Sequence, residues 1–265
     1  ERREWWLSNG LGGYAAGTVA GTLTRRYHGL LVAPVHPPLG RLLVMAKADA
    51  TLLDGGREID LCTNRWRGGA IAPHGYCNIE SFRLEGRMPV WRFAVGDLVV
   101  EQRIWMEHGA NTTYVGFRCA AGLKPGRRLE LRLRLLVNAR DYHGSSRAGD
   151  FAPLVESSAD ELRVVHSCAF TLHLRTAGGE VSPRHDWFEN IDLPLERERG
   201  LPDADANLCV GEATFDLAGG NWAGLTVSLD PQASTRLEEA MRRFVARDAG
   251  RLRRVKADLP EMRAA

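Results

Sequence analysis

Hydrophobic and polar residues alternate along most of the chain with a period of two. The clearest case is the stretch from Leu129 to Val137, where leucine or valine at every odd position alternates with Glu130, Arg132 and Arg134. Residues 98–106 and 112–119 show a similar mixture of aliphatic, aromatic and polar side chains. Strands with one apolar and one polar face are typical of antiparallel sheets with one buried side.

Eight further segments are predicted to be strands, separated by glycine-rich turns such as Asp54-Gly-Gly56. They are Gly29–Ala33, Arg41–Ala46, Ser81–Glu85, Val90–Val95, Glu161–His166, Phe170–Thr176, Glu212–Leu217 and Trp222–Leu229. More than ten strands within residues 1–230 predict a mainly β fold, a large antiparallel sandwich of two sheets.

Only one segment has strong helical spacing. Between Ser234 and Lys256 the apolar residues recur every three or four positions. Thr235-x-x-Glu238 resembles a capping box, and Pro260 is a stop signal. The helix is rich in arginine, which predicts a linker or docking helix with one solvated face.

The stretch from Ser182 to Cys209 follows neither period. It contains Trp187, Phe188 and seven Asp or Glu residues. We therefore predict a long irregular insertion that forms one wall of a binding cleft.

Composition excludes several classes of protein. The 265 residues are 44% hydrophobic and 26% charged, as in soluble globular proteins, and the net charge of +2 gives no electrostatic case for nucleic acid. The uncharged stretch from Trp5 to Thr24 has too many glycines and threonines, and too few large aliphatic residues, for a membrane helix or a signal peptide. We expect neither a nucleic-acid partner nor a membrane.

We also expect no metal and no cofactor. The five cysteines are odd in number and form no CxxC pair, which predicts reduced thiols in a cytoplasmic protein. Gly10–Ala15 matches the dinucleotide pattern GxGxxA but follows no buried strand. The one set of residues that could supply zinc ligands lacks the spacing of a zinc module: His74, Cys77, His166 and Cys168.

Two polar blocks stand beside predicted strands. Tyr, His, Asn, Asp and Arg side chains together suit carbohydrate, because aromatic rings stack on sugars and planar polar groups bond to hydroxyls. A satisfied polar network at a sheet edge or domain interface is the alternative. We predict that the blocks converge on one rim of the sandwich, as a substrate-binding or domain-interface site formed by Arg26, Tyr27, His28, Asn138, Arg140, Asp141, Tyr142 and His143.

No local catalytic motif is present. The sequence contains no GxSxG, SxxK or HExxH pattern. Paired carboxylates for glycoside hydrolysis would have to meet in space, and the candidates are Asp141, Glu189 and Glu196.

Three blocks carry a resemblance to a known family. Ser8–Ala33, which begins Ser-Asn-Gly-Leu-Gly-Gly-Tyr and contains Arg-Arg-Tyr-His-Gly, resembles the opening of the N-terminal domain of the bacterial and archaeal type of glycogen debranching enzyme. Val137–His143 resembles a second block of that family, and Trp187–Asp203 a third. The order Asp203-Ala-Asp-Ala-Asn207 departs from the usual acidic pair before an apolar residue.

The resemblance covers nearly the whole chain and implies a specific role. It implies a galactose mutarotase-like β-supersandwich, residues 1–230, and a helical linker, residues 231–265, towards a separate (α/α)₆ barrel. That barrel hydrolyses α-1,6 branch glucose in glycogen catabolism. The chain alone is then expected to be inactive, a cytoplasmic domain that supports the barrel and helps to bind α-glucan, either glycogen or maltooligosaccharide.

Two other functions remain open from the sequence. One is a free-standing sugar mutarotase or epimerase with a histidine acid and a glutamate base, for which His28, His74 and His143 are candidates. The other is a plain glycan-binding module on the same sandwich.

Overall fold

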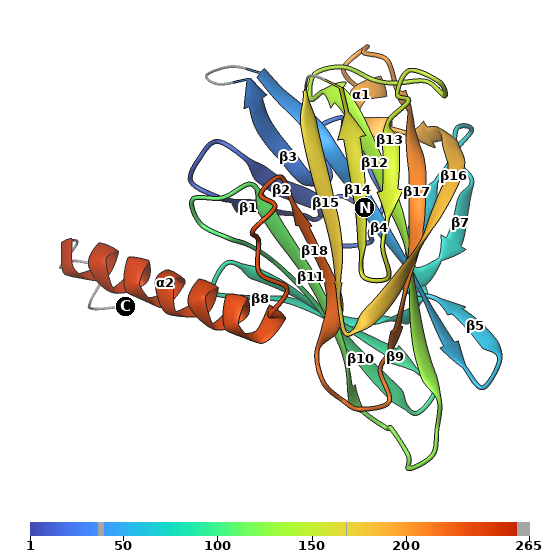
Figure 1. Ribbon diagram of the computed structural model, residues 1–265, viewed down its shortest axis with the longest axis vertical. Coiled ribbons are helices and arrows are strands. Elements are labelled where there is room, and N and C mark those ends of the chain that lie inside the picture. The colour runs from blue at the N-terminus through green and yellow to red at the C-terminus, as the bar shows by residue number, and fades with distance from the viewer. Residues whose placement is uncertain (37–39, 168, 259–265) are drawn as a thin grey trace.

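The computed structural model describes residues 1–36, 40–167 and 169–258, and two large antiparallel sheets form most of it (Figure 1). The first sheet has the order β1-β2-β3-β4-β12-β17-β16, with β5 paired to β4. Its strands are β1 (Glu4–Ser8), β2 (Tyr14–Thr18), β3 (Gly29–His36), β4 (Gly40–Asp54), β5 (Arg57–Asp60), β12 (Leu129–Asp141), β16 (Gly179–Asp192) and β17 (Ala204–Asp216).

The second sheet has the order β13-β14-β15-β18-β11-β10-β9-β8. Its strands are β8 (Ile79–Glu85), β9 (Met88–Val95), β10 (Leu98–Met106), β11 (Thr112–Ala121), β13 (Leu154–Ser157), β14 (Glu161–His166), β15 (Phe170–Ala177) and β18 (Ala223–Ser228). A small hairpin and two short helices complete the body: β6 (Thr63–Arg65), β7 (Ile71–His74), η1 (Gly75–Asn78) and α1 (Pro194–Arg197).

The predicted sandwich is confirmed, and its core follows from the alternation of β12. Leu131, Leu133 and Leu135 are fully buried between the sheets, whereas the residues between them point away from that core. β12 pairs with β4 on one side and β17 on the other, so it lies in the middle of the first sheet. A strand in that position has to bury one face completely, which is what period-two leucines supply.

A second apolar cluster covers part of the outer face of the first sheet. The register of β12 shifts near Leu136, and Leu136 belongs to this cluster rather than to the main core. The loop before β3 and the segment around α1 meet over this face, where the backbone N–H of Leu195 donates to the carbonyl of Thr24 (3.2 Å). We call this group the outer-face cluster: Tyr14, Ala16, Leu23, Val32, Leu43, Ala46, Leu136, Ile191 and Leu193.

The prediction of an irregular insertion at 182–209 is wrong. Strand β16 occupies most of its first half, and β17 begins within its second half. β16 is an edge strand with mostly exposed side chains on both faces, so it shows no alternation of apolar and polar residues. Only the short connection that contains α1 is without strand structure.

The predicted helix is present as α2 (Leu237–Asp258). It begins two residues after the predicted cap, and Ser234 Oγ accepts the N–H of Arg236 (3.1 Å). Its first turns pack on the outer face of the second sheet, where Leu237 and Met241 contact a cluster that includes Trp105. Further along, Asp248 is buried and pairs with Arg87 in the turn between β8 and β9, and the last turns of the helix project from the body (Figure 1). Neither α2 nor any other helix in the described ranges combines the length and apolar character needed to span a bilayer.

Candidate functional site

The glycine-rich segment near the start of the chain forms a tight turn between β1 and β2, which the side chain of Asn9 holds by hydrogen bonds. Asn9 is fully buried, and its Oδ1 accepts the backbone N–H groups of Leu11 (2.8 Å) and Gly13 (3.0 Å). Its Nδ2 donates to Asn111 Oδ1 (2.8 Å) in the β10–β11 turn. Gly10 has a φ of 83°, and a Cβ there would collide with the ring of His108. The GxGxxA pattern therefore reflects a tight turn and close packing.

The structure brings the two predicted polar blocks together. Arg26 Nη1 donates to the carbonyl of His143, and the Tyr27 hydroxyl lies 3.0 Å from His143 Nδ1. Arg140 Nη2 donates to the carbonyl of Arg26 (2.8 Å). The first block lies in the loop between β2 and β3, and the second at the end of β12. We call the eight predicted residues the rim.

An ion pair on the buried side of the rim holds the second block in place. Arg140 Nη2 lies 2.9 Å from Asp205 Oδ2, and both side chains are almost inaccessible to water. Asp205 Oδ1 also accepts the N–H of Ser146 (2.8 Å), and Asn138 Nδ2 donates to Asn207 Oδ1 (2.8 Å). Asn138 and Arg140 are thus buried and support the surface from below.

Glu196 of α1 holds the first block. Its carboxylate is fully buried, accepts the backbone N–H of Arg26 (3.1 Å) and lies 3.5 Å from Arg26 Nη2. Sequence reasoning treated Glu196 as a possible catalytic carboxylate, whereas here it fastens a loop. Asp141 and Glu189, the other two candidates, have exposed side chains, and Asp141 Oδ1 accepts the N–H of His143 (2.8 Å).

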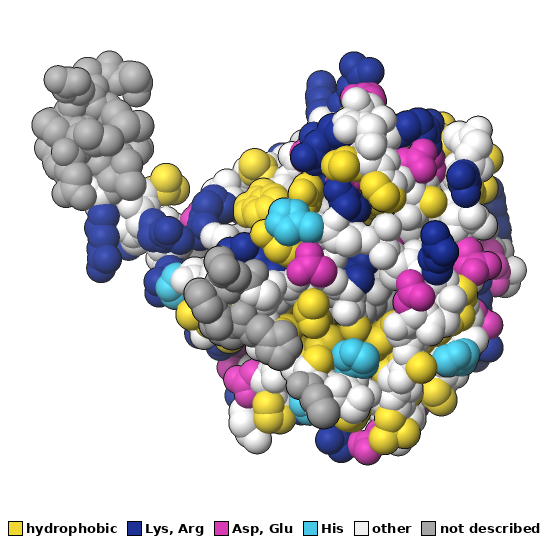
Figure 2. All heavy atoms as spheres, turned by 90° about the horizontal axis from the view of Figure 1, so that it is seen from above, with side chains coloured by type: hydrophobic (Ala, Val, Ile, Leu, Met, Phe, Trp, Pro, Cys, Tyr) yellow, Lys and Arg dark blue, Asp and Glu magenta, His cyan; other side chains and the backbone are white. Residues whose placement is uncertain are grey.

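Aromatic side chains give the rim its surface. The rings of Tyr27 and Tyr142 have centroids 5.8 Å apart, and the guanidinium of Arg41 lies 5.5 Å from the centre of the Tyr142 ring. Beside them Trp6 stacks on Tyr14 with centroids 4.1 Å apart. Figure 2 views the molecule from the end that carries α1 in Figure 1, and hydrophobic and basic side chains lie side by side there.

His28 lies beneath this surface as a neutral imidazole. The residue is 2% exposed, Nδ1 accepts the backbone N–H of Thr24 (3.1 Å), and Nε2 lies 3.4 Å from Glu4 Oε1. Burial lowers the pKa of His28 to about 4. Burial also raises the pKa of the Tyr14 hydroxyl. Both groups are therefore uncharged at neutral pH.

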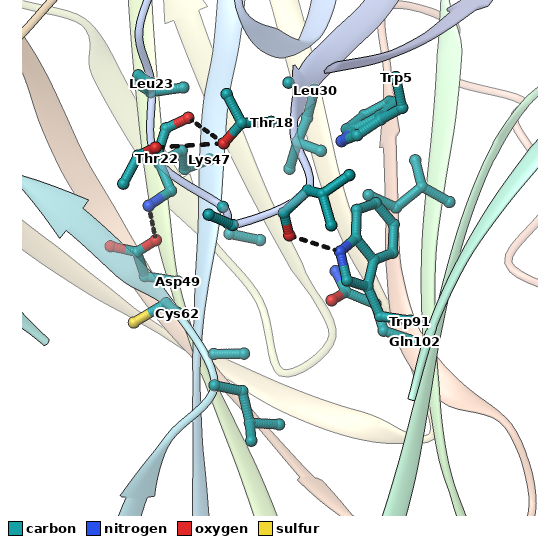
Figure 3. A pocket seen from close by; sticks show the side chains of 18 of the residues that line it. Trp5, Thr18, Thr22, Leu23, Leu30, Lys47, Asp49, Cys62, Trp91 and Gln102 are labelled. Atoms are coloured by element: carbon teal, nitrogen blue, oxygen red, sulfur yellow. Dashed lines mark hydrogen bonds and ion pairs between the residues drawn. The ribbon is translucent and has the colours of Figure 1, made fainter. Parts of the chain in front are cut away.

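A separate cavity of about 90 Å³ lies between the sheets, lined by Trp5, Trp91 and an ion pair (Figure 3). That pair joins Lys47 Nζ to Asp49 Oδ1 (2.7 Å), and Asn64 Nδ2 donates to Asp49 Oδ2 (2.6 Å). The charges compensate each other, and the space suits a few water molecules better than a sugar ring. We assign the cavity a structural role.

Potential metal ligands are not gathered anywhere in the described ranges, where no three His, Cys, Asp or Glu side chains form a suitable group. His74, Cys77 and His166 lie in those ranges, and Cys168 lies outside the described residues. Burial raises the pKa of the Cys62 and Cys209 thiols, which keeps both protonated at neutral pH.

Comparison with known proteins defines the family. The sequence model described as "Glycogen debranching enzyme N terminal" matches residues 3–223. The chain belongs to this family. Among solved structures, a bacterial glucoamylase complexed with acarbose aligns over 91% of this chain and 35% of its own, with 10% identity and a TM-score of 0.38. The search of curated proteins gives no match.

The resemblance stated from the sequence is thereby confirmed. In the structure of this member of the debranching N-terminal family, the three sequence blocks lie together. Tyr14 from the first block, Tyr142 from the second and Phe188 from the third all pack in or against the outer-face cluster. The ionic contacts of Arg26 and Arg140 connect the same regions of the chain. Sequence reasoning missed Trp6, Asp205 and Asn207, although the polar alternation at 203, 205 and 207 is a signal of a strand with a buried polar face.

Proposed function

We propose that this chain is the non-catalytic N-terminal domain of a glycogen debranching α-1,6-glucosidase. In this role it supports an (α/α)₆ catalytic barrel and helps to position the α-glucan. The observation that carries the proposal is the convergence of the three family blocks on one outer face, held by the buried Arg140–Asp205 pair. The chain covers 35% of the length of the glucoamylase that it matches.

The chemistry of the rim supports a docking role. Buried ion pairs fix the backbone below, while Tyr27, Tyr142 and His143 present rings at the surface. Aromatic and arginine side chains are the residue types that contribute most to protein interfaces. A surface of aromatic side chains on a rigid, buried support is suited to bind a second domain. We propose residues 231–265 as the linker to that domain.

The arrangement favours this role over a mutarotase or epimerase. An acid–base pair would have to flank a bound sugar, but His28 and Glu4 face each other at 3.4 Å, and His28 Nδ1 is already occupied by a backbone N–H. We further propose a cytoplasmic location, supported by free thiols at all four cysteines in the described part of the chain.

The proposal predicts that the chain alone does not hydrolyse glycosidic bonds. Glu196, the one buried carboxylate among the three candidates, is engaged by Arg26, and Asp141 caps a turn. The measurement is glucose release from a branched limit dextrin by the purified 265-residue chain. Release above that of a mock purification would contradict a non-catalytic role.

A further inference from the structure

A hollow of about 340 Å³ lies beside the rim on the outer face of the first sheet. Trp6 of β1 lines it together with Arg25 and Tyr27 of the β2–β3 loop. Ala16, the cross-strand partner of Trp6, also lines it, and its small side chain leaves this space open.

Trp6 is preorganised as a flat platform. Its indole is 57% exposed although it stacks on Tyr14 with an interplanar angle of 20°. Tyr14 is itself buried and belongs to the outer-face cluster, so it supports the indole from one side. On β1, Glu4 and Trp6 point to the same side of the sheet. One face of the indole is thus covered and fixed, and the other remains available to a ligand.

The hollow carries no net charge. Arg25 Nε lies 2.7 Å from Glu4 Oε1, so these two charges cancel. His28, whose pKa burial lowers to about 4, is neutral at pH 7. Neither a phosphate nor a cationic group finds an uncompensated opposite charge among these lining residues, which favours a neutral ligand.

The hollow also offers hydrogen-bonding groups at its edge. Glu4 Oε2 and the two Nη groups of Arg25 have no other partner among the described residues. A flat apolar ring beside a planar carboxylate and a guanidinium matches a pyranose, which has an apolar C–H face and equatorial hydroxyls.

We propose that this hollow binds a glucose ring of an α-glucan, with the apolar face of the sugar on Trp6 and its hydroxyls towards Glu4 and Arg25. The choice of an α-glucan among neutral sugars rests on the proposed function. The site would hold a polymer strand on the surface of this domain. It is distinct from the rim residues that we assign to docking, apart from the shared Tyr27 and His28.

The test is a titration of the 265-residue chain with maltohexaose, followed by calorimetry and ligand-observed NMR. We expect saturable binding with a Kd of about 1 mM, which is typical of a single stacked ring. Trp6→Ala should weaken it by about tenfold or more, and Trp6→Phe, which keeps a ring, should weaken it less. Leu11→Ala is the matched control, because Leu11 is similarly exposed but does not line the hollow.

Two results would overturn the proposal. One is the absence of saturable binding up to about 10 mM sugar, and the other is an unchanged affinity in Trp6→Ala. If Trp6→Ala instead lowers the stability of the joined domains in the full-length protein, while the chain binds no sugar, Trp6 is a protein contact. The proposed function would then stand without the glucan site.

Discussion

Arg140 and Asp205 form an ion pair that water scarcely reaches. Their side chains are 6% and 1% exposed and 2.9 Å apart. Removing one charge of such a pair leaves the other buried without compensation. The pair also receives two hydrogen bonds from Ser146, so its loss would loosen the end of β12 and the rim above it.

Asp205→Asn is therefore predicted to lower the free energy of unfolding by about 3–5 kcal/mol. Urea denaturation measures the change. Glu239→Gln is the matched control, since Glu239 pairs with Arg236 in an exposed contact of 3.1 Å and should cost less than about 1 kcal/mol. Equal effects of the two substitutions would show that burial does not govern the Asp205 pair.

A second prediction at the scale of the residue concerns the pH dependence of stability that His28 causes. The pKa of His28 is about 4 in the folded chain and 6.5 for an ordinary histidine, as in the unfolded chain. The unfolded chain therefore binds the proton first as the pH falls. Stability should be complete above pH 6.5 and decrease towards pH 4, by at most about 3 kcal/mol. The cause is the burial of the His28 side chain, which disfavours the charged imidazolium.

The measurement compares urea denaturation at several pH values in the native chain and in His28→Asn. The variant cannot titrate and should show a flatter pH dependence between 6.5 and 4. His185→Asn, at an exposed position of β16, should keep the native slope. A native slope in His28→Asn would assign the acid sensitivity to other groups.

At the scale of elements, α2 has a buried side and an exposed side. Leu237 is buried against the cluster that contains Trp105, and Asp248, further along the helix, is buried and pairs with Arg87, whereas Val245 is 48% exposed. The buried side covers an apolar area of the second sheet, and the exposed side carries a series of arginines. Burial of one side holds the helix to the sandwich.

Leu237→Ala should accordingly destabilise the chain by about 2–3 kcal/mol, because it removes buried methyl groups and leaves a cavity. Val245→Ala should change stability by less than about 0.5 kcal/mol. Thermal or urea denaturation with a circular dichroism signal measures both. A large effect of Val245→Ala alone would mean that the side of the helix that carries Val245, not the side that carries Leu237, packs on the body.

Elements differ in how far the sequence predicts them. β12 was predictable because a central strand with one buried face requires alternating leucines. β16 was not, because an exposed edge strand has no apolar face to maintain. β1 and β2 were hidden by the glycine-rich turn between them, although Trp5 and Leu7 point to the core on alternate positions.

The site was predictable in part for the same physical reasons. The two polar blocks stand where strands begin or end, and side chains there leave the core, so their proximity followed from position. The residues that these blocks contact could not be predicted in this way. Glu196 and Asp205 lie far along the chain, and only the packing of α1 over the first sheet and the pairing of β17 with β12 bring them to Arg26 and Arg140.

At the scale of the whole molecule, the outer faces of the two sheets carry different elements. α2 covers the outer face of the second sheet, and the three family blocks converge on the outer face of the first. The β1–β2 turn connects these regions at the end of the sandwich, where Gly10 packs on His108. This arrangement supports the proposed role of the chain as a domain that docks on a catalytic barrel.

The most direct test of that role is a paired measurement on Asp141→Ala, in the proposed full-length glucosidase and in the 265-residue chain. In the chain Asp141 is exposed and makes one local hydrogen bond, to the N–H of His143. Its loss there should cost about 1 kcal/mol. Buried at an interface with the barrel and paired with a cation, the same carboxylate should be worth about 3–5 kcal/mol. The predicted result is a clearly larger stability loss in the full-length protein, with reduced glucosidase activity. A similar loss in both proteins, with activity intact, would contradict the interface.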